Sequence, residues 1–124
     1  MFNVELSVGD FGGHPVVALR GQLDLADAPD VAAELAAIVA ARGPSVIVDL
    51  TDLEFIDSSG LGVLVRTLRR TREGGGDLYL AAPQQQVRRL LHVTGLIRAF
   101  PVHDSVEAAA TEAGPVPAVP TAAL

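Results

Sequence analysis

Residues Val46–Gly62 have the sequence VIVDLTDLEFIDSSGLG, in which an apolar, β-branched run gives way to an aspartate, two serines and a glycine. The run Val46–Leu50 is typical of a buried strand. Behind the serines, apolar residues recur at helical spacing, at Leu61, Leu64, Val65 and Leu68. The segment therefore predicts a buried strand, a short loop that carries Asp57, Ser58 and Ser59, and a helix that begins beside them.

The residues around this segment predict further strands and helices in alternation. Apolar alternation or short apolar runs predict strands at Asn3–Val8, Pro15–Gly21, Leu78–Ala81 and around Phe100–Val102. A first helix is predicted around Val31, Leu35, Ile38 and Val39, entered at Asp27 with Pro29 in its first turn and ended by Gly43-Pro44. Gly74–Gly76 ends the helix that follows the serines. A third helix is predicted at Gln84–Val93, and a fourth at Ser105–Glu112 with Asp104 as its N-cap.

This order of elements predicts an α/β fold with an N-terminal β-hairpin. The sheet is expected to be mixed, mostly parallel and made of about five strands, with about four helices. Residues 1–112 form the predicted domain. From Gly114 onward three prolines interrupt any periodic pattern, so residues 113–124 are predicted to be a disordered, proline-rich tail.

Composition limits the classes of function. The chain has 124 residues, which suits one domain, and 49% of them are hydrophobic. Nine basic residues, all arginine, stand against fifteen acidic ones, and this balance argues against nucleic-acid or anionic-membrane partners. Cysteine is absent, which removes thiol chemistry. Met1–Glu5 does not resemble a secretory signal, and no apolar stretch has the length of a membrane span, so we expect a cytoplasmic protein.

Ser58 and Ser59 are expected at a helix N-terminus, where free N–H groups and the helix dipole favour negative charge. A phosphate on either serine would therefore be tolerated there. An Asp-Ser-Ser triplet by itself is also explained by helix capping, worth about 1 kcal/mol. Gly62 favours the functional interpretation, because a glycine inside a helix costs roughly 1 kcal/mol unless something approaches the backbone closely.

A helical wheel places Gly62, Arg66, Arg69 and Arg70 away from the apolar stripe. This outer face starts beside Ser58, with a small residue near the serines and guanidinium groups farther along. It is either a docking face for an acidic partner or a solvated charged surface.

Four segments in this order resemble those of STAS-domain anti-sigma-factor antagonists of the SpoIIAA type. They are Val46–Gly62 itself and the stretches GQLDL (21–25), LHVTGL (91–96) and FPVHDSVEA (100–108). The resemblance covers roughly residues 3–112 and implies a STAS-like fold.

The resemblance implies a regulatory binding protein rather than an enzyme. When unphosphorylated, such a protein binds a serine-kinase anti-sigma factor and frees its sigma factor; the kinase uses Mg-ATP to phosphorylate the serine that follows the aspartate, here Ser58. Phosphorylation ends binding, and a serine phosphatase restores it. No cofactor is expected in the chain itself. The partner-binding residues implied are Asp24, Asp57, Ser58, Ser59, Gly60, Leu61, Gly62 and Arg66. Asp24 is equally explained as a turn residue.

A second use of the same domain stays open: a scaffolding or regulatory STAS module in a signalling or transport complex, without phosphorylation. Other classes fit poorly. A response-regulator receiver would need a lysine near its last strand, and a serine hydrolase would need Gly-x-Ser-x-Gly, whereas Ile56 lies two positions before Ser58. The three histidines lack metal-ligand spacing, so no metal site is expected, and Gly74–Gly76 lacks the lysine of a phosphate loop.

Overall fold

The computed structural model describes residues 3–116, which contain five strands, four α-helices and one 3₁₀ turn. The strands are β1 (Val4–Phe11), β2 (His14–Leu23), β3 (Val46–Ile56), β4 (Leu78–Ala81) and β5 (Val102–His103). The helices are α1 (Ala28–Arg42), α2 (Ser58–Glu73), α3 (Gln85–Val93) and α4 (Val106–Ala113), and the 3₁₀ turn η1 covers Leu96–Arg98.

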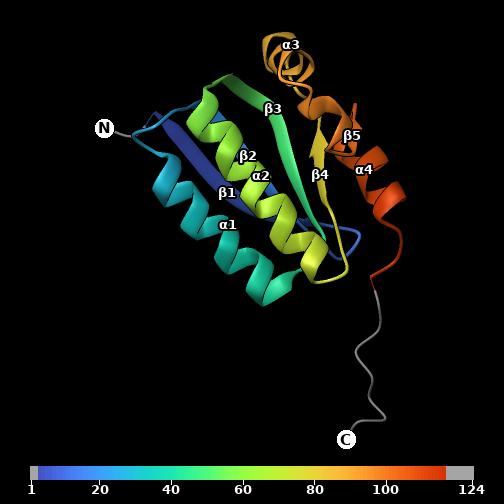
Figure 1. Ribbon diagram of the computed structural model, residues 1–124. Helices are drawn as coiled ribbons and strands as arrows, with labels where there is room; N and C mark the ends of the chain where they lie inside the picture. The colour runs from blue at the N-terminus through green and yellow to red at the C-terminus, as the bar shows by residue number, and fades with distance from the viewer. Residues whose placement is uncertain (1–2, 117–124) are drawn as a thin grey trace, which may run out of the picture.

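The strands form one sheet in the order β1-β2-β3-β4-β5 (Figure 1). β1 and β2 are an antiparallel hairpin, and the three remaining pairs of neighbours are parallel. Parallel neighbours require crossovers, which α1, α2 and α3 with η1 supply. The predicted mixed, mostly parallel sheet with an N-terminal hairpin is confirmed.

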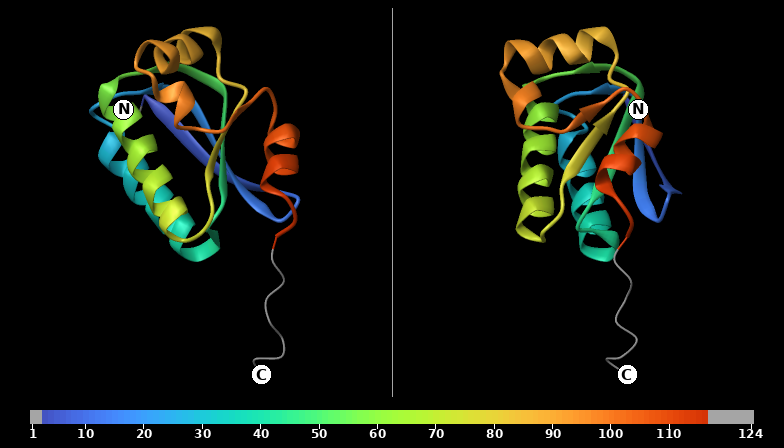
Figure 2. Two further views of the ribbon diagram at one scale, coloured as in Figure 1. Left: turned by 45° about the vertical axis from the view of Figure 1, so that its right-hand side comes forward. Right: turned by 90° about the vertical axis from the view of Figure 1, so that its right-hand side faces the viewer.

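Helices α1 and α2 lie side by side over one face of the sheet and close the main core (Figure 1). Aliphatic side chains fill this core, and its fully buried members include Leu19, Leu23, Leu35, Leu50, Leu53, Leu64, Leu78, Leu80 and Leu91. The opposite face is covered only in part, by α4 (Figure 2), which packs on a small cluster of Ile47, Tyr79, Ala81 and Ala109. A chain with few aromatics thus builds its core from leucine and valine.

β3 is longer than predicted. It continues past Leu50 to Ile56, and its second half pairs with β2 through contacts such as Leu53 with Gly21 and Ile56 with Leu23. The register shifts twice along this pair. Each shift breaks the period-two alternation, so the sequence after Leu50 lacks a regular strand pattern. The loop expected before Asp57 is therefore part of the strand, and Asp57 alone joins β3 to α2.

Two helix starts differ from the prediction in detail. Ser105, not Asp104, caps α4, because its side chain accepts a hydrogen bond from the Ala108 N–H at 3.0 Å. Asp27 precedes α1 as predicted, but its carboxylate makes no capping bond and accepts from the Asn3 N–H at 3.2 Å instead. The turn η1 had no counterpart in the prediction.

At the C-terminal boundary, α4 ends at Ala113, one residue beyond the predicted limit of the domain. The carbonyl of Gly114 lies 2.6 Å from Nε2 of the buried His14. The predicted disordered tail falls mostly on residues 117–124, which lie outside the described residues. Within residues 3–116, no helix has both the length and the apolar character needed to cross a membrane.

We predict that Leu64→Ala lowers the free energy of unfolding by about 2–5 kcal/mol, because it leaves a cavity between α2 and the sheet. Leu64 is 1% exposed, whereas Leu25, in the β2–α1 connection, is 70% exposed. Leu25→Ala, the same chemical change, should cost less than about 0.5 kcal/mol. Urea unfolding followed by circular dichroism measures both, and equal losses would contradict the assigned core.

Candidate functional site

The carboxylate of Asp57 joins three segments of the chain. Oδ1 accepts a hydrogen bond from the Gly60 N–H at 2.9 Å, which caps α2, and Oδ2 accepts one from the Leu25 N–H at 3.1 Å. The backbone N–H of Asp57 donates to the Leu23 carbonyl at 3.2 Å. Asp57 therefore fixes the start of α2 against the end of β2 and the connection that follows it.

Ser58 and Ser59 are the first two residues of α2. Ser58 is exposed and Ser59 is half-buried. N–H groups in the first turn of a helix lack intrahelical partners, so the backbone around Ser58 has a positive local potential. Because Asp57 already fixes the helix start, the Ser58 hydroxyl is presented to solvent on a rigid element.

The two glycines that follow have opposite surroundings. A Cβ on Gly60 would lie 2.6 Å from Ile56 Cγ1 and 3.0 Å from the Leu23 carbonyl oxygen, so α2 passes too close to β2 and β3 for any side chain there. A Cβ on Gly62 would meet the end of the flexible Arg66 side chain, with Nη1 at 3.4 Å. Gly60 is thus needed for packing, whereas the fold leaves space beside Gly62.

Asp24 belongs to the turn between β2 and α1. Its Oδ1 accepts from the Ala26 N–H at 3.0 Å, the pattern of an Asx-turn, and its Oδ2 accepts from the Asn3 side-chain amide at 3.2 Å. Because Leu25 donates to Asp57, the turn is held beside the start of α2. The structure thus shows a turn role for Asp24 and places it on the same side of the molecule as Asp57.

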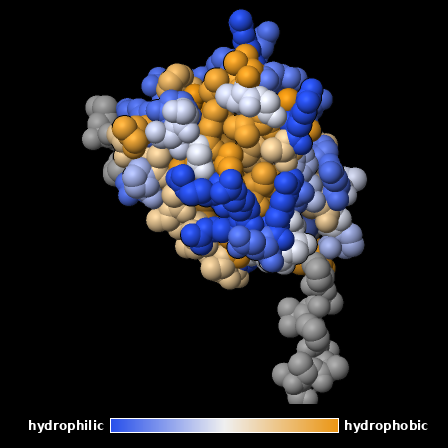
Figure 3. Space-filling model, viewed as in Figure 1, coloured by the Kyte–Doolittle hydropathy of each residue, from blue (hydrophilic) through white to orange (hydrophobic). Residues whose placement is uncertain are grey.

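A shallow groove runs from Ser58 along α2, between this helix and the segment from the end of α3 to η1. We call it the α2–η1 groove; it is lined by Ser58, Leu61, Gly62, Val65, Arg66, Arg69, Thr94 and Leu96. Figure 3 shows hydrophobic surface exposed along this side of the molecule, with hydrophilic residues at its border. The sequence pattern missed Thr94 and Leu96, because residues from a later segment cannot be assigned to a groove without the tertiary structure.

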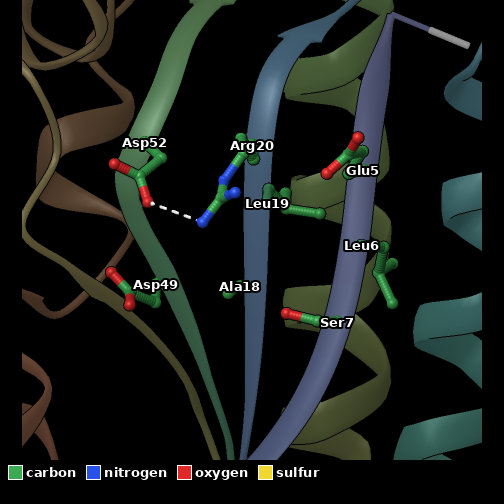
Figure 4. A pocket seen from close by; sticks show the side chains of 8 residues that line it. All are labelled: Glu5, Leu6, Ser7, Ala18, Leu19, Arg20, Asp49 and Asp52. Carbon is green, nitrogen blue, oxygen red and sulfur yellow. Dashed lines mark ion pairs between the residues drawn. The ribbon is translucent and has the colours of Figure 1, made fainter.

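A second hollow lies on the uncovered face of the sheet, over β1, β2 and β3 (Figure 4). Its charged groups include Arg20 and Asp52, whose side chains form an exposed ion pair at 3.5 Å. Within residues 3–116, no group of three or more His, Cys, Asp or Glu side chains is placed to hold a metal ion. Burial, with Asp77 and Glu112 nearby, raises the pKa of Tyr79, which lies under α4 away from the serines.

The structure brings most of the predicted site residues together. Ser58, Leu61, Gly62 and Arg66 line one groove, while Asp57 and Gly60 shape its end from within. Leu61 is only 5% exposed, so most of its side chain packs in the core. Arg69, which the wheel had assigned to the outer face, also lines the groove.

We predict opposite effects of alanine at the two glycines. Gly60→Ala should lower the free energy of unfolding by about 1–3 kcal/mol, because the new methyl group overlaps Ile56 and the Leu23 backbone. Gly62→Ala should raise it by up to about 1 kcal/mol, because alanine favours the helix and space is available. Urea unfolding of both variants is the measurement. Equal destabilisation would show that Gly62 is also required for packing.

Comparison with known proteins gives the family. The model of the STAS domain matches residues 7–109. The chain is 34% identical to BtrV of Bordetella bronchiseptica, over 86% of this chain and 92% of that protein, and 30% identical to the anti-sigma F factor antagonist of Paenibacillus polymyxa, over 89% and 95%. The crystal structure of an anti-sigma factor antagonist from Mycobacterium paratuberculosis has a TM-score of 0.77 at 31% identity, over 89% and 93%. The chain belongs to the STAS domain family, among its anti-sigma factor antagonists.

Proposed function

We propose that the unphosphorylated chain binds a serine-kinase anti-sigma factor and thereby frees a sigma factor, and that phosphorylation of Ser58 ends this binding. The observation that carries the proposal is the exposure of Ser58 at the first position of α2, with Asp57 already hydrogen-bonded on both oxygens. The proposed contact surface consists of Asp24, Asp57, Ser58, Ser59, Gly60, Leu61, Gly62 and Arg66.

The proposed modification transfers the γ-phosphoryl group of Mg-ATP to Ser58 Oγ, with release of ADP and of the hydroxyl proton. The kinase supplies the nucleotide and the catalytic groups, so the chain itself acts as a substrate and a binding protein. A serine phosphatase would hydrolyse the phosphoester and restore the binding form. The proposal includes a cytoplasmic location for the chain and these partners.

The geometry suggests that phosphorylation acts on the contact surface and not on the fold. A dianionic group at a helix start is favoured by the free N–H groups and the dipole. On the outer side it adds bulk and charge beside Asp57 and the Asp24 turn. An acidic partner that docks at this end of α2 would then meet added bulk and added like charge.

We predict that incubation with the cognate anti-sigma kinase and Mg-ATP adds one phosphoryl group to the wild-type chain and none to Ser58→Ala. Intact-mass spectrometry measures the gain, with candidate kinases taken from the same genome. A mass gain that persists in Ser58→Ala would show that another residue accepts the phosphoryl group, with Ser59 as the next candidate. No gain with any candidate kinase would favour a scaffolding STAS module that works without phosphorylation.

For binding, Ser58→Ala should keep the affinity of the wild-type chain for the anti-sigma factor. Ser58→Asp should weaken it, because it adds a negative charge beside Asp57. Titration calorimetry compares the two variants. Equal affinity would contradict the proposed repulsion at the interface.

A bulky charge beside Gly62 should block docking without unfolding the chain. We predict that Gly62→Asp weakens binding to the anti-sigma factor by about tenfold or more, because the side chain enters the open space at the groove. Circular dichroism checks that the fold is kept, and Gly62→Ala is the smaller control. Wild-type affinity of Gly62→Asp would show that the partner does not approach this part of α2.

A further inference from the structure

Most arginines of the chain lie in one interval of the sequence. Seven of the nine arginines lie between Ser58 and Phe100, but only two of the fifteen acidic residues do. This interval contains α2, α3 and η1, the elements that border the α2–η1 groove. In a chain with a net charge of −6 these elements are therefore locally rich in positive charge, and two of their arginines, Arg66 and Arg69, line the groove.

Several of these arginines have no ion-pair partner within residues 3–116. Among residues 3–116, four arginines pair with aspartates, at Arg20–Asp52, Arg42–Asp10, Arg72–Asp77 and Arg88–Asp104. Within the same described part of the chain, Arg66, Arg69, Arg70, Arg89 and Arg98 have no carboxylate at ion-pair distance. Arg66 and Arg69 line the groove itself.

The groove combines these unpaired charges with an apolar lining. Val65 and Leu96 contribute half-buried hydrophobic side chains, beside the edge of the mostly buried Leu61 and the side-chain-free Gly62. Thr94 lies at the groove with its hydroxyl already donating to the Leu90 carbonyl at 2.8 Å. The partner that complements such a surface presents a row of apolar side chains flanked by carboxylates.

We propose that the α2–η1 groove binds an acidic amphipathic helix of the protein partner, with its apolar side chains against Val65 and Leu96 and its carboxylates on Arg66 and Arg69. The identification of this partner as the anti-sigma factor rests on the proposed function. The apolar lining and the acidity of the rest of the chain favour a protein segment over a nucleic acid.

The position of Ser58 connects this groove to the phosphorylation switch. Ser58 lines one end of the groove, and Arg66 Nη1 reaches back to within 3.4 Å of the position of a Cβ on Gly62, one helical turn from Ser58. A phosphate on Ser58 would add negative charge on the approach of the acidic helix and would compete with it for Arg66.

The test uses the purified chain and two designed helical peptides of about 14 residues. Both carry leucines at positions i, i+3, i+4 and i+7, and they differ only in having glutamate or lysine at the remaining positions. Fluorescence anisotropy gives the affinities, and amide chemical shifts locate the bound peptide. We expect the acidic peptide to bind about tenfold more tightly than the basic one, with shifts confined to α2 and Thr94–Leu96.

Arginine substitutions on α2 provide the matched comparison. Arg69 lies inside the groove, and Arg69→Glu should lower the affinity for the acidic peptide about fivefold or more. Arg70→Glu makes the same change of charge on the same helix outside the groove, and it should change this affinity less than about twofold. Equal effects of the two substitutions, equal binding of the two peptides, or shifts on another face would overturn the proposal. A 12-base-pair DNA duplex is the alternative ligand. If it binds about tenfold or more tightly than the acidic peptide, and Arg69→Glu abolishes this binding, the groove would be assigned to a nucleic acid instead of a protein helix.

These measurements contain no kinase and no ATP, so they separate the groove from the phosphorylation of Ser58. If the acidic peptide binds but no phosphoryl group is transferred in the kinase experiment, the proposal for the groove stands and the proposed phosphorylation of Ser58 is refuted. If Ser58 is phosphorylated but peptide affinity does not depend on Arg69 as expected, the proposed switch stands and the proposal for the groove is refuted.

Discussion

The candidate site depends on the two hydrogen bonds accepted by the Asp57 carboxylate, from Gly60 and from Leu25. They stabilise the first turn of α2 and hold it against the end of β2, whose Leu23 carbonyl accepts from the Asp57 N–H. Asp57 is the single residue between β3 and α2. Because no longer loop separates β3 from α2, these hydrogen bonds determine the orientation of α2 and the exposure of Ser58.

Close packing behind the helix start complements this cap. Gly60 lets α2 approach Ile56 and Leu23 within a distance that no side chain would allow. Two residues later, Gly62 lies at the groove, where a Cβ would meet only the end of the flexible Arg66 side chain. The inner side of α2 is thus closely packed against the sheet, whereas its outer side has room for a larger side chain. The proposed phosphate on Ser58 would therefore lie on the proposed contact surface without entering the core.

Much of this arrangement could be predicted from the sequence, because periodic apolar residues, prolines and glycines report local structure directly. The N-terminal hairpin, the parallel strands and the helix behind Asp57-Ser58-Ser59 were predicted in this way. The second half of β3 was not, because two register shifts hide the strand period between Thr51 and Ile56. Ser105 in place of Asp104 as the cap of α4 also depends on backbone geometry that either residue could have adopted.

The site was predictable residue by residue but not as a surface. The serines, Gly62 and Arg66 follow from one continuous segment, whereas Thr94 and Leu96 join them only through the packing of α3 and η1 beside α2. Asp24 shows the same limit, since its bonds to Ala26 and Asn3 assign it a turn role that the sequence left open. The distribution of arginines was visible in the sequence, but which of them remain unpaired was not.

We propose that a phosphate on Ser58 changes the contact surface and leaves the fold intact. The decisive measurement is amide hydrogen exchange of a chain synthesised with phosphoserine at position 58, compared residue by residue with the unmodified chain. We expect unchanged protection at Leu25 and Gly60 together with reduced affinity for the anti-sigma factor. Loss of protection at these two amides, or in the α2 core, would contradict it, because phosphorylation would then act by opening the structure that Asp57 holds together.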